Sequence, residues 1–211
     1  MSDAVATTRR REATRHRLLT AAADVFAEIG LDAASVEAIC ERAGFTRGAF
    51  YSNFESKDEL MLELAASIAE QKIAAVRDRV LEVDASDLRF QPEKLVLHVL
   101  DAEGDDRAGI LLANEIQMRA MRDRTLAATY ARSQDLHIAS ITALIDDVAR
   151  RFGMRLRLPS TALARVLMQT WEASATSAVI DGLSDDARCT LVNSRVAAIA
   201  VALIDSPEQQ G

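Results

Sequence analysis

Arg47 and Tyr51 stand four residues apart, which places them on one face of a helix. Phe50 and Phe54, also four apart, share a different face that can pack inward. An arginine can donate two parallel hydrogen bonds to a guanine edge in the DNA major groove. Gly48 lies beside the outer face, where its missing side chain would let the backbone approach a phosphate or a base edge closely. A helix over these residues therefore suits the major groove.

Two helix starts and one tight turn would hold this face in place. Ser35 can cap one helix, with Val36 and Ile39 on its inner face, and Thr46 can cap the next. Gly44 stands between them, where the chain must leave helical geometry and a positive φ is expected. Two short helices joined by a glycine turn are the layout of a DNA-reading helix-turn-helix.

Each of these residues also has an ordinary structural interpretation. Taken alone, Arg47 is more typical of a solvated surface charge, and Tyr51 of a half-buried helix residue. Lys57 precedes Asp58 and Glu59, and the three are typical of the charged first turn of a long helix. That role for Lys57 is compatible with a phosphate contact. The combination of residues, rather than any one of them, favours DNA binding.

The segment from Leu18 to Leu60 resembles the TetR family of bacterial transcriptional regulators. The likeness rests on residues that all fall in register, namely Gly44, Thr46, Gly48, Ala49, Tyr51, Phe54 and Lys57. The remaining two thirds of the chain carries no comparable signature. The resemblance implies phosphate contacts from Ser35, Tyr51 and Lys57, and base-edge or backbone contacts around Thr46, Arg47, Gly48, Ala49, Ser52 and Asn53.

Two positions depart from the family pattern. Asn53 stands where many members have histidine, although an Asn amide can still donate to a phosphate or pair with adenine. Glu37 stands where some members place a base-reading arginine, so the first of the two helices is expected to contribute less to sequence choice.

Charge is distributed unevenly along the chain. The first twenty residues contain five arginines and two acidic residues, which gives this segment a net charge of +3. The rest of the chain must therefore carry −10 to reach the total of −7. A basic end on an acidic protein is expected if only that end meets a polyanion. We expect residues 1–13 to form a flexible basic arm, and a solubilising tail is the equal alternative for its arginines.

The composition predicts an all-α protein. Of its 211 residues 49% are hydrophobic, and there are only eight Gly and three Pro. Apolar residues recur at helical spacing from Leu18 to Ile29, before Gly30, and again from Leu60 to Val80 in one long helix. We expect a three-helix helix-turn-helix domain over residues 14–57, followed over 58–211 by a helical domain for ligand binding and dimerisation. Breaks are expected near 83–92, 102–107, 118–123, 153–159 and 181–184, with a helix starting at Pro92.

No apolar run approaches the roughly 18 residues that cross a bilayer, and the N-terminus lacks a signal-peptide pattern. A cytoplasmic location without membrane contact is therefore expected. Nor does any motif indicate an enzyme, because G-x-S-x-G, HExxH and P-loop patterns are all missing. The three histidines stand alone, and Cys40 and Cys189 lack metal-ligand spacing, so we expect no cofactor, metal site or disulfide.

The last two predicted helices, 159–182 and 184–204, indicate a subunit interface. In the second of them apolar residues cover more than one face, so the helix must be covered on two sides. TetR-like proteins dimerise by pairing two such helices into a four-helix bundle. The expected interface residues are Leu167, Val196, Ile199, Ala200 and Leu203. An ordinary monomeric core is the alternative.

The resemblance also implies that a small organic molecule of unknown identity binds in the second domain. Large flexible apolar groups with a few polar neighbours suit an amphipathic ligand. Candidate lining residues are Met118, Met121, Tyr130, Met168, Gln169, Trp171 and Glu172. Such residues at helical spacing are also typical of a plain hydrophobic core.

The expected function is DNA-binding transcriptional regulation, as a repressor. A homodimer would bind a palindromic operator in double-stranded DNA and release it when the ligand binds. One alternative is a helical enzyme or carrier that retains a DNA-binding-like domain, and the intact face from Thr46 to Lys57 argues against it. Another is a regulator controlled by a protein partner without a ligand, which the sequence does not separate from the first reading.

Overall fold

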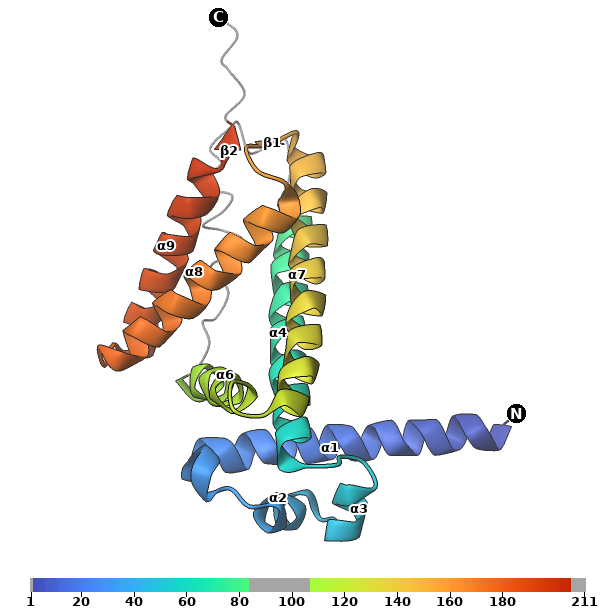
Figure 1. Cartoon of the computed structure of the whole chain (residues 1–211). Helices are drawn as coiled ribbons and strands as arrows, with labels where there is room; N and C mark the ends of the chain where they lie inside the picture. The colour runs from blue at the N-terminus through green and yellow to red at the C-terminus, as the bar shows by residue number, and fades with distance from the viewer. Residues whose placement is uncertain (1, 84–106, 206–211) are drawn as a thin grey trace, which may run out of the picture. The chain divides into compact units, whose positions relative to one another are not determined.

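The computed structural model describes residues 2–83 and 107–205, and this part of the chain is almost entirely helical (Figure 1). The elements are α1 (Ser2–Ala33), α2 (Val36–Ala43), α3 (Arg47–Tyr51), α4 (Lys57–Glu82), α6 (Arg107–Ala120), α7 (Arg124–Phe152), β1 (Arg155–Leu156), α8 (Ser160–Ile180), α9 (Asp185–Ala202) and β2 (Ile204–Asp205). The predicted all-α class is confirmed. None of the helices in these two ranges is long and apolar enough to cross a membrane.

Most helix ends fall where the sequence predicts them. The break between α6 and α7 lies inside the predicted 118–123 interval, and the breaks on either side of α8 match 153–159 and 181–184. The long helix after Lys57 is confirmed as α4. The breaks expected near 83–92 and 102–107, and the start expected at Pro92, fall outside the described residues, apart from residues 83 and 107.

The first helix differs from its prediction at both ends. It begins at Ser2, so the segment expected to be a flexible arm is helical. Alanine and arginine, which both favour helical backbone, are frequent in residues 2–17. Gly30 has φ 80° and ψ 166°, so it kinks the helix, and one further turn follows to Ala33.

Two compact units make up the chain, and their limits differ from the predicted boundary after residue 57. The first unit comprises Met1–Ser67 together with Glu115–Tyr130, and the second comprises Ile68–Asn114 together with Ala131–Gly211. In the first unit the largest fully buried side chains come from α1 to the start of α4: Leu18, Ile39, Phe50, Phe54, Leu60 and Met61. The helix-turn-helix therefore shares its core with the first turns of α4.

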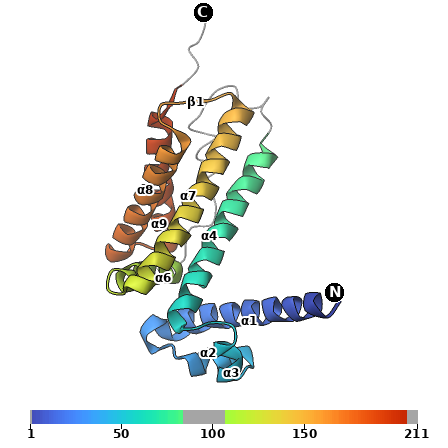
Figure 2. The same ribbon diagram turned by 45° about the vertical axis from the view of Figure 1, so that its right-hand side comes forward.

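The second unit is built around the α8–α9 pair. These helices lie side by side, and α7 runs along the later part of α4 (Figure 2). The core cluster of the second unit joins α6, α8 and α9. It consists of Ile110, Ala175, Val192 and Val196, with Leu167, Trp171 and Val179 packed against it. β1 and β2 pair antiparallel, Leu156 opposite Ile204, and this short pairing was not expected from the sequence.

Candidate nucleic-acid interface

The turn between α2 and α3 has the local geometry that the sequence predicts. Ser35 Oγ accepts a hydrogen bond from Ala38 N at 3.1 Å, and Thr46 Oγ1 accepts one from Ala49 N at 3.2 Å, so both helices carry side-chain caps. Gly44 has φ 70° and ψ 34°, the left-handed conformation that glycine adopts without steric cost. The predicted caps and the predicted positive φ are confirmed.

α3 buries one face and exposes the other. Phe50 and Phe54 are 0% and 1% exposed, and their ring centroids lie 5.7 Å apart. Arg47 has 61% of its side chain exposed, and Tyr51 is 50% exposed. The Phe50 ring meets the Tyr51 ring edge to face at 5.2 Å, so the buried face also supports the exposed one.

The other residues expected at this interface fall into two groups. Ser35, Thr46, Gly48 and Ser52 are exposed, whereas Ala49 is half-buried. A Cβ added at Gly48 would lie 3.7 Å from Thr46 Oγ1, which is an ordinary contact. Packing within the chain therefore does not require glycine at this position.

Asn53 differs from the residues before it because its side chain is turned into the fold. The residue is 8% exposed, and its Nδ2 donates to the Ala49 carbonyl at 2.8 Å and to Ser52 Oγ at 3.2 Å. Asn53 Oδ1 is buried and has no hydrogen-bond partner among the described residues. A DNA contact from this amide would require the side chain to rotate outward.

Lys57 is also engaged within the chain. Its Nζ donates to the carbonyls of Leu31 at 2.7 Å and Ala34 at 2.5 Å, and it lies 5.8 Å from the centre of the Phe26 ring. Burial, followed by the charge of Arg119, lowers the pKa of Lys57. Lys57 thus ties the end of α1 to the start of α4, and a phosphate would have to share its ammonium group with these carbonyls.

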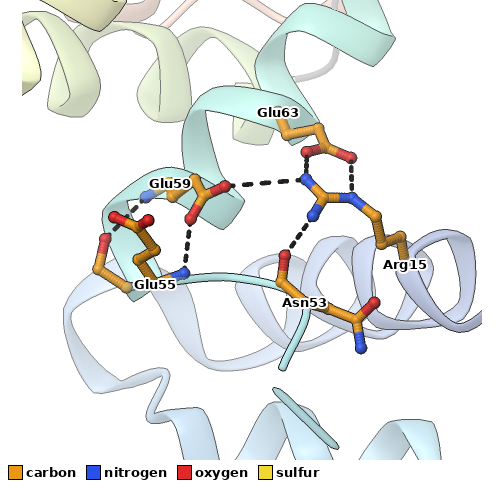
Figure 3. A network of polar contacts seen from close by, with 6 residues as sticks. Arg15, Asn53, Glu55, Glu59 and Glu63 are labelled. Carbon is orange, nitrogen blue, oxygen red and sulfur yellow. Dashed lines mark hydrogen bonds and ion pairs between the residues drawn. The ribbon is translucent and has the colours of Figure 1, made fainter. Parts of the chain in front are cut away.

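Arg15 lies at the centre of a polar network that joins α1, the segment after α3, and α4 (Figure 3). Its Nε donates to Glu63 at 3.1 Å, Nη2 donates to the second oxygen of Glu63, and Nη1 donates to the Asn53 carbonyl. The guanidinium lies over the Phe54 ring at 4.3 Å, and Glu59 approaches it at 3.8 Å. The planar guanidinium fork is suited to holding several groups at once.

Arg17, two residues further along α1, has a similar role beside the turn glycine Gly44. Its Nη2 donates to the Ala43 carbonyl at 2.8 Å, and its guanidinium lies 4.6 Å from the centre of the Phe45 ring. Two of the arginines that the sequence counted toward a basic end are therefore used to hold α2 and α3 in place. Arg9, Arg10 and Arg11 are exposed.

Replacing Arg15 by alanine is expected to lower the free energy of unfolding by about 1–3 kcal/mol, because the variant loses charge-assisted hydrogen bonds and leaves Glu63 unpaired. Urea denaturation followed by circular dichroism measures the loss. Arg11→Ala is the matched control, since it removes an exposed arginine one turn earlier on α1 and should change stability little. Equal stability of the two variants would contradict the role assigned to the network.

Comparison with known proteins places this geometry in a family. Residues 18–64 match the family model of bacterial regulatory proteins of the tetR family. Over 115 residues the chain is 32% identical to the HTH-type transcriptional regulator UidR of Escherichia coli K12, covering 54% of this chain and 56% of UidR. The helix-turn-helix segment of this chain is therefore of the TetR type.

Other similarities agree with this match. The chain is 36% identical over 94 residues to the HTH-type transcriptional regulator SrpR of Pseudomonas putida, which covers 43% of this chain and 40% of SrpR. It thus spans about half the length of the curated relatives that it matches. A crystal structure of a putative transcriptional regulator from Rhodococcus sp. RHA1 has a TM-score of 0.69 at 21% identity, covers 92% of this chain and 97% of that one, and shows the shared fold.

The segment Glu115–Tyr130 is tied to the helix-turn-helix by Arg119. Arg119 Nη1 donates to Asp58 at 2.7 Å, and its Nε donates to Glu115 at 2.6 Å. The hydrogen bond with Glu115 is the main cause that raises the pKa of Arg119, and Asp58 adds to it. Together they outweigh burial, which lowers this pKa. The end of α6 is therefore fixed to the start of α4, a link that no local sequence pattern indicates.

The candidate ligand residues are divided between the two units. Met118, Met121 and Tyr130 belong to the first unit, and the other four lie on α8 in the second. Met118 and Met121 are 43% and 74% exposed, and Gln169 is also exposed. Met168, Trp171 and Glu172 are half-buried and follow one another at helical spacing.

Glu172 is the ionisable member of this half-buried group. Burial raises the pKa of Glu172, and its hydrogen bond with Gln134 of α7 opposes that effect. Beside it, Lys72 Nζ of α4 lies 5.3 Å from the centre of the Trp171 ring. A partly desolvated carboxyl, an aromatic ring and an ammonium group are thus gathered in the second unit.

The residues expected at a dimer interface also separate into two groups. Val196 and Ala200 are 4% and 6% exposed, so the single chain already covers them, and Val196 belongs to the core cluster against which Leu167 packs. Ile199 and Leu203 are half-buried, as is Leu167. Other residues of α8 and α9 are exposed instead, among them Ala173, Ile180, Ala198 and Ala202.

Proposed function

We propose that this chain is a DNA-binding transcriptional regulator whose α3 enters the major groove. The observation that carries the proposal is the two-sided packing of α3, with Phe50 and Phe54 fully buried while Arg47 and Tyr51 point to solvent. Gly48 supports it, because a glycine that packing does not require is explained by close approach of an external partner.

We further propose that the regulator works as a homodimer on a palindromic operator. A helix-turn-helix protein that reads two half-sites has them spaced by one helical turn, about 34–36 Å, or a multiple. The exposed side of α8 and α9 supports the dimer, since Ile180 is 79% exposed in the single chain although it is a large apolar residue. Small residues at Ala173, Ala198 and Ala202 would let two helix pairs approach closely.

A genomic footprint of the full-length chain, followed by gel shifts with the recovered duplexes and with random duplex, tests this function. The wild-type protein is expected to bind recovered duplexes more tightly, with a preferred base order repeated in inverted half-sites. Arg47→Ala should lower that affinity roughly 5- to 150-fold and relax the preference at one position in each half-site. Equal binding of recovered and random duplexes would exclude the proposed function.

We also propose that a small organic ligand releases the repressor from its operator. Met168, Trp171 and Glu172 support a ligand site in the second unit, because a flexible thioether, an aromatic ring and a half-buried carboxyl suit an amphipathic molecule. Met118 and Met121 are left out of this set, since an enclosed apolar site would bury them. Release requires only that the ligand bind the DNA-free shape more tightly.

Trp171→Ala is expected to weaken ligand binding while operator binding stays within a factor of about two, because Trp171 lies in the second unit, outside the residues proposed to contact DNA. Ligands would first be found by thermal-shift screening of amphipathic metabolites and drugs against the wild-type chain. Coupling between the two binding sites must be reciprocal. Operator DNA should therefore lower the affinity for the ligand by the same factor by which the ligand lowers the affinity for DNA, typically about 5- to 150-fold. A ligand that binds free and operator-bound protein equally well would contradict the switch.

A further inference from the structure

Glu37 and Arg47 form an ion pair between the first turns of α2 and α3. Arg47 Nη1 lies 2.5 Å from Glu37 Oε1, and the two side chains remain 61% and 56% exposed. The pair thus lies on the same outer surface as the residues proposed to read DNA. Glu37 was not among the contacts that the family resemblance implied.

Stability does not explain this ion pair. Exposed ion pairs contribute little to folding, because solvent screens them and two long side chains lose freedom. Glu37 stands in the first turn of α2, where a carboxylate is favoured by the helix terminus without any arginine partner. Both α2 and α3 also have their own caps from Ser35 and Thr46.

The pair does constrain the Arg47 side chain. The guanidinium carbon of Arg47 also lies 5.9 Å from the centre of the Tyr51 ring. A guanidinium has five N–H donors, so the carboxylate leaves others for an external acceptor. An arginine already held in one orientation loses less side-chain entropy when it binds a base edge.

Glu37 also carries a charge that repels the phosphate backbone. A carboxylate beside the reading arginine disfavours any placement that brings phosphates close to it, whatever the DNA sequence. Cationic groups alone would strengthen binding to every duplex alike. The combination of Glu37 with Arg47 therefore favours one register over the others.

We propose that Glu37 is a positioning and specificity-determining residue, which orients Arg47 toward a base edge and weakens binding to duplexes that lack this base. The inference rests on the proposed DNA-binding function and deepens it. Glu37 itself need not contact the DNA. Its effect on base choice is transmitted through Arg47, so removing either side chain should affect the same position of each half-site.

Selection from a pool of fully randomised duplexes, carried out with the full chain and its variants, tests this inference. Glu37→Gln keeps the size of the side chain and removes its charge, and it should lower the preference at the Arg47 position roughly two- to fivefold, the range expected for an exposed ion pair. Random duplexes should bind this variant at least as tightly as they bind wild type. Added to Arg47→Ala, the Glu37 change should cause no further loss of preference at that position.

Glu41→Gln is the matched control, because it removes the same charge from an exposed residue one turn later on α2. It should leave base preference unchanged, and far-UV circular dichroism should show all variants folded. A Glu37→Gln variant with undiminished preference at the Arg47 position overturns this inference alone. So does additivity of the two substitutions. A wild-type chain that selects no sequence overturns the proposed function, and this inference with it.

Discussion

Replacing Phe50 by alanine is expected to lower the unfolding free energy of the helix-turn-helix unit by about 3–5 kcal/mol, the usual cost of truncating a buried phenylalanine. The side chain is 0% exposed and contacts the rings of Tyr51 and Phe54, so the cavity would lie directly beneath the exposed face of α3. Urea denaturation of the full chain measures this loss through far-UV circular dichroism.

The neighbouring residue provides the matched contrast. Tyr51 is 50% exposed, so Tyr51→Ala should cost little stability and should instead weaken DNA binding. The only tryptophan of the chain, Trp171, lies in the second unit, and its fluorescence follows that unit separately. A Phe50→Ala protein as stable as Tyr51→Ala would show that α3 is not packed as described.

Replacing Ala198 by glutamate is expected to split the proposed dimer into monomers. Ala198 is exposed in the single chain, so the substitution should not unfold it. In a two-fold symmetric interface the new charge is buried twice, and each unpaired buried charge costs several kcal/mol. Sedimentation velocity at micromolar concentration would then show a monomer, and operator binding would weaken because two half-sites are no longer read together.

Two further variants make this result specific. Ala143→Glu adds the same charge at an exposed alanine of α7 in the same unit, and it should remain dimeric. Ala200→Glu should instead destabilise the fold, because Ala200 is 6% exposed within one chain. If Ala198→Glu sediments as a dimer, the interface must be sought on another surface.

Local patterns allowed the helix-turn-helix to be predicted in detail. The caps at Ser35 and Thr46, the conformation of Gly44 and the inward direction of Phe50 all depend on neighbours within four residues. Such interactions can be predicted from residue spacing, because a helix fixes which nearby residues share a face. For the same reason, the sequence was enough to predict which face of α3 packs inward.

Roles that depend on distant partners could not be predicted in this way. Arg15 finds its acceptors 38 and 48 residues along the chain, and Arg17 finds one 26 residues away. Before folding, these arginines are indistinguishable from Arg9 or Arg11 in the same basic run. Likewise, periodicity showed that the last helix is apolar on several sides, but not that Val196 and Ala200 face the core of their own chain.

The contacts of Arg15 and Arg17 within the fold affect how DNA binding should respond to ionic strength. Each phosphate that a cationic side chain neutralises releases condensed counterions and adds about 0.9 to the slope of log affinity against log salt concentration. Arginines held by Glu63 and by the Ala43 carbonyl displace few such ions. The N-terminal region thus carries more positive charge in its sequence than it offers to a polyanion, and the counterion stoichiometry should be lower than its number of arginines.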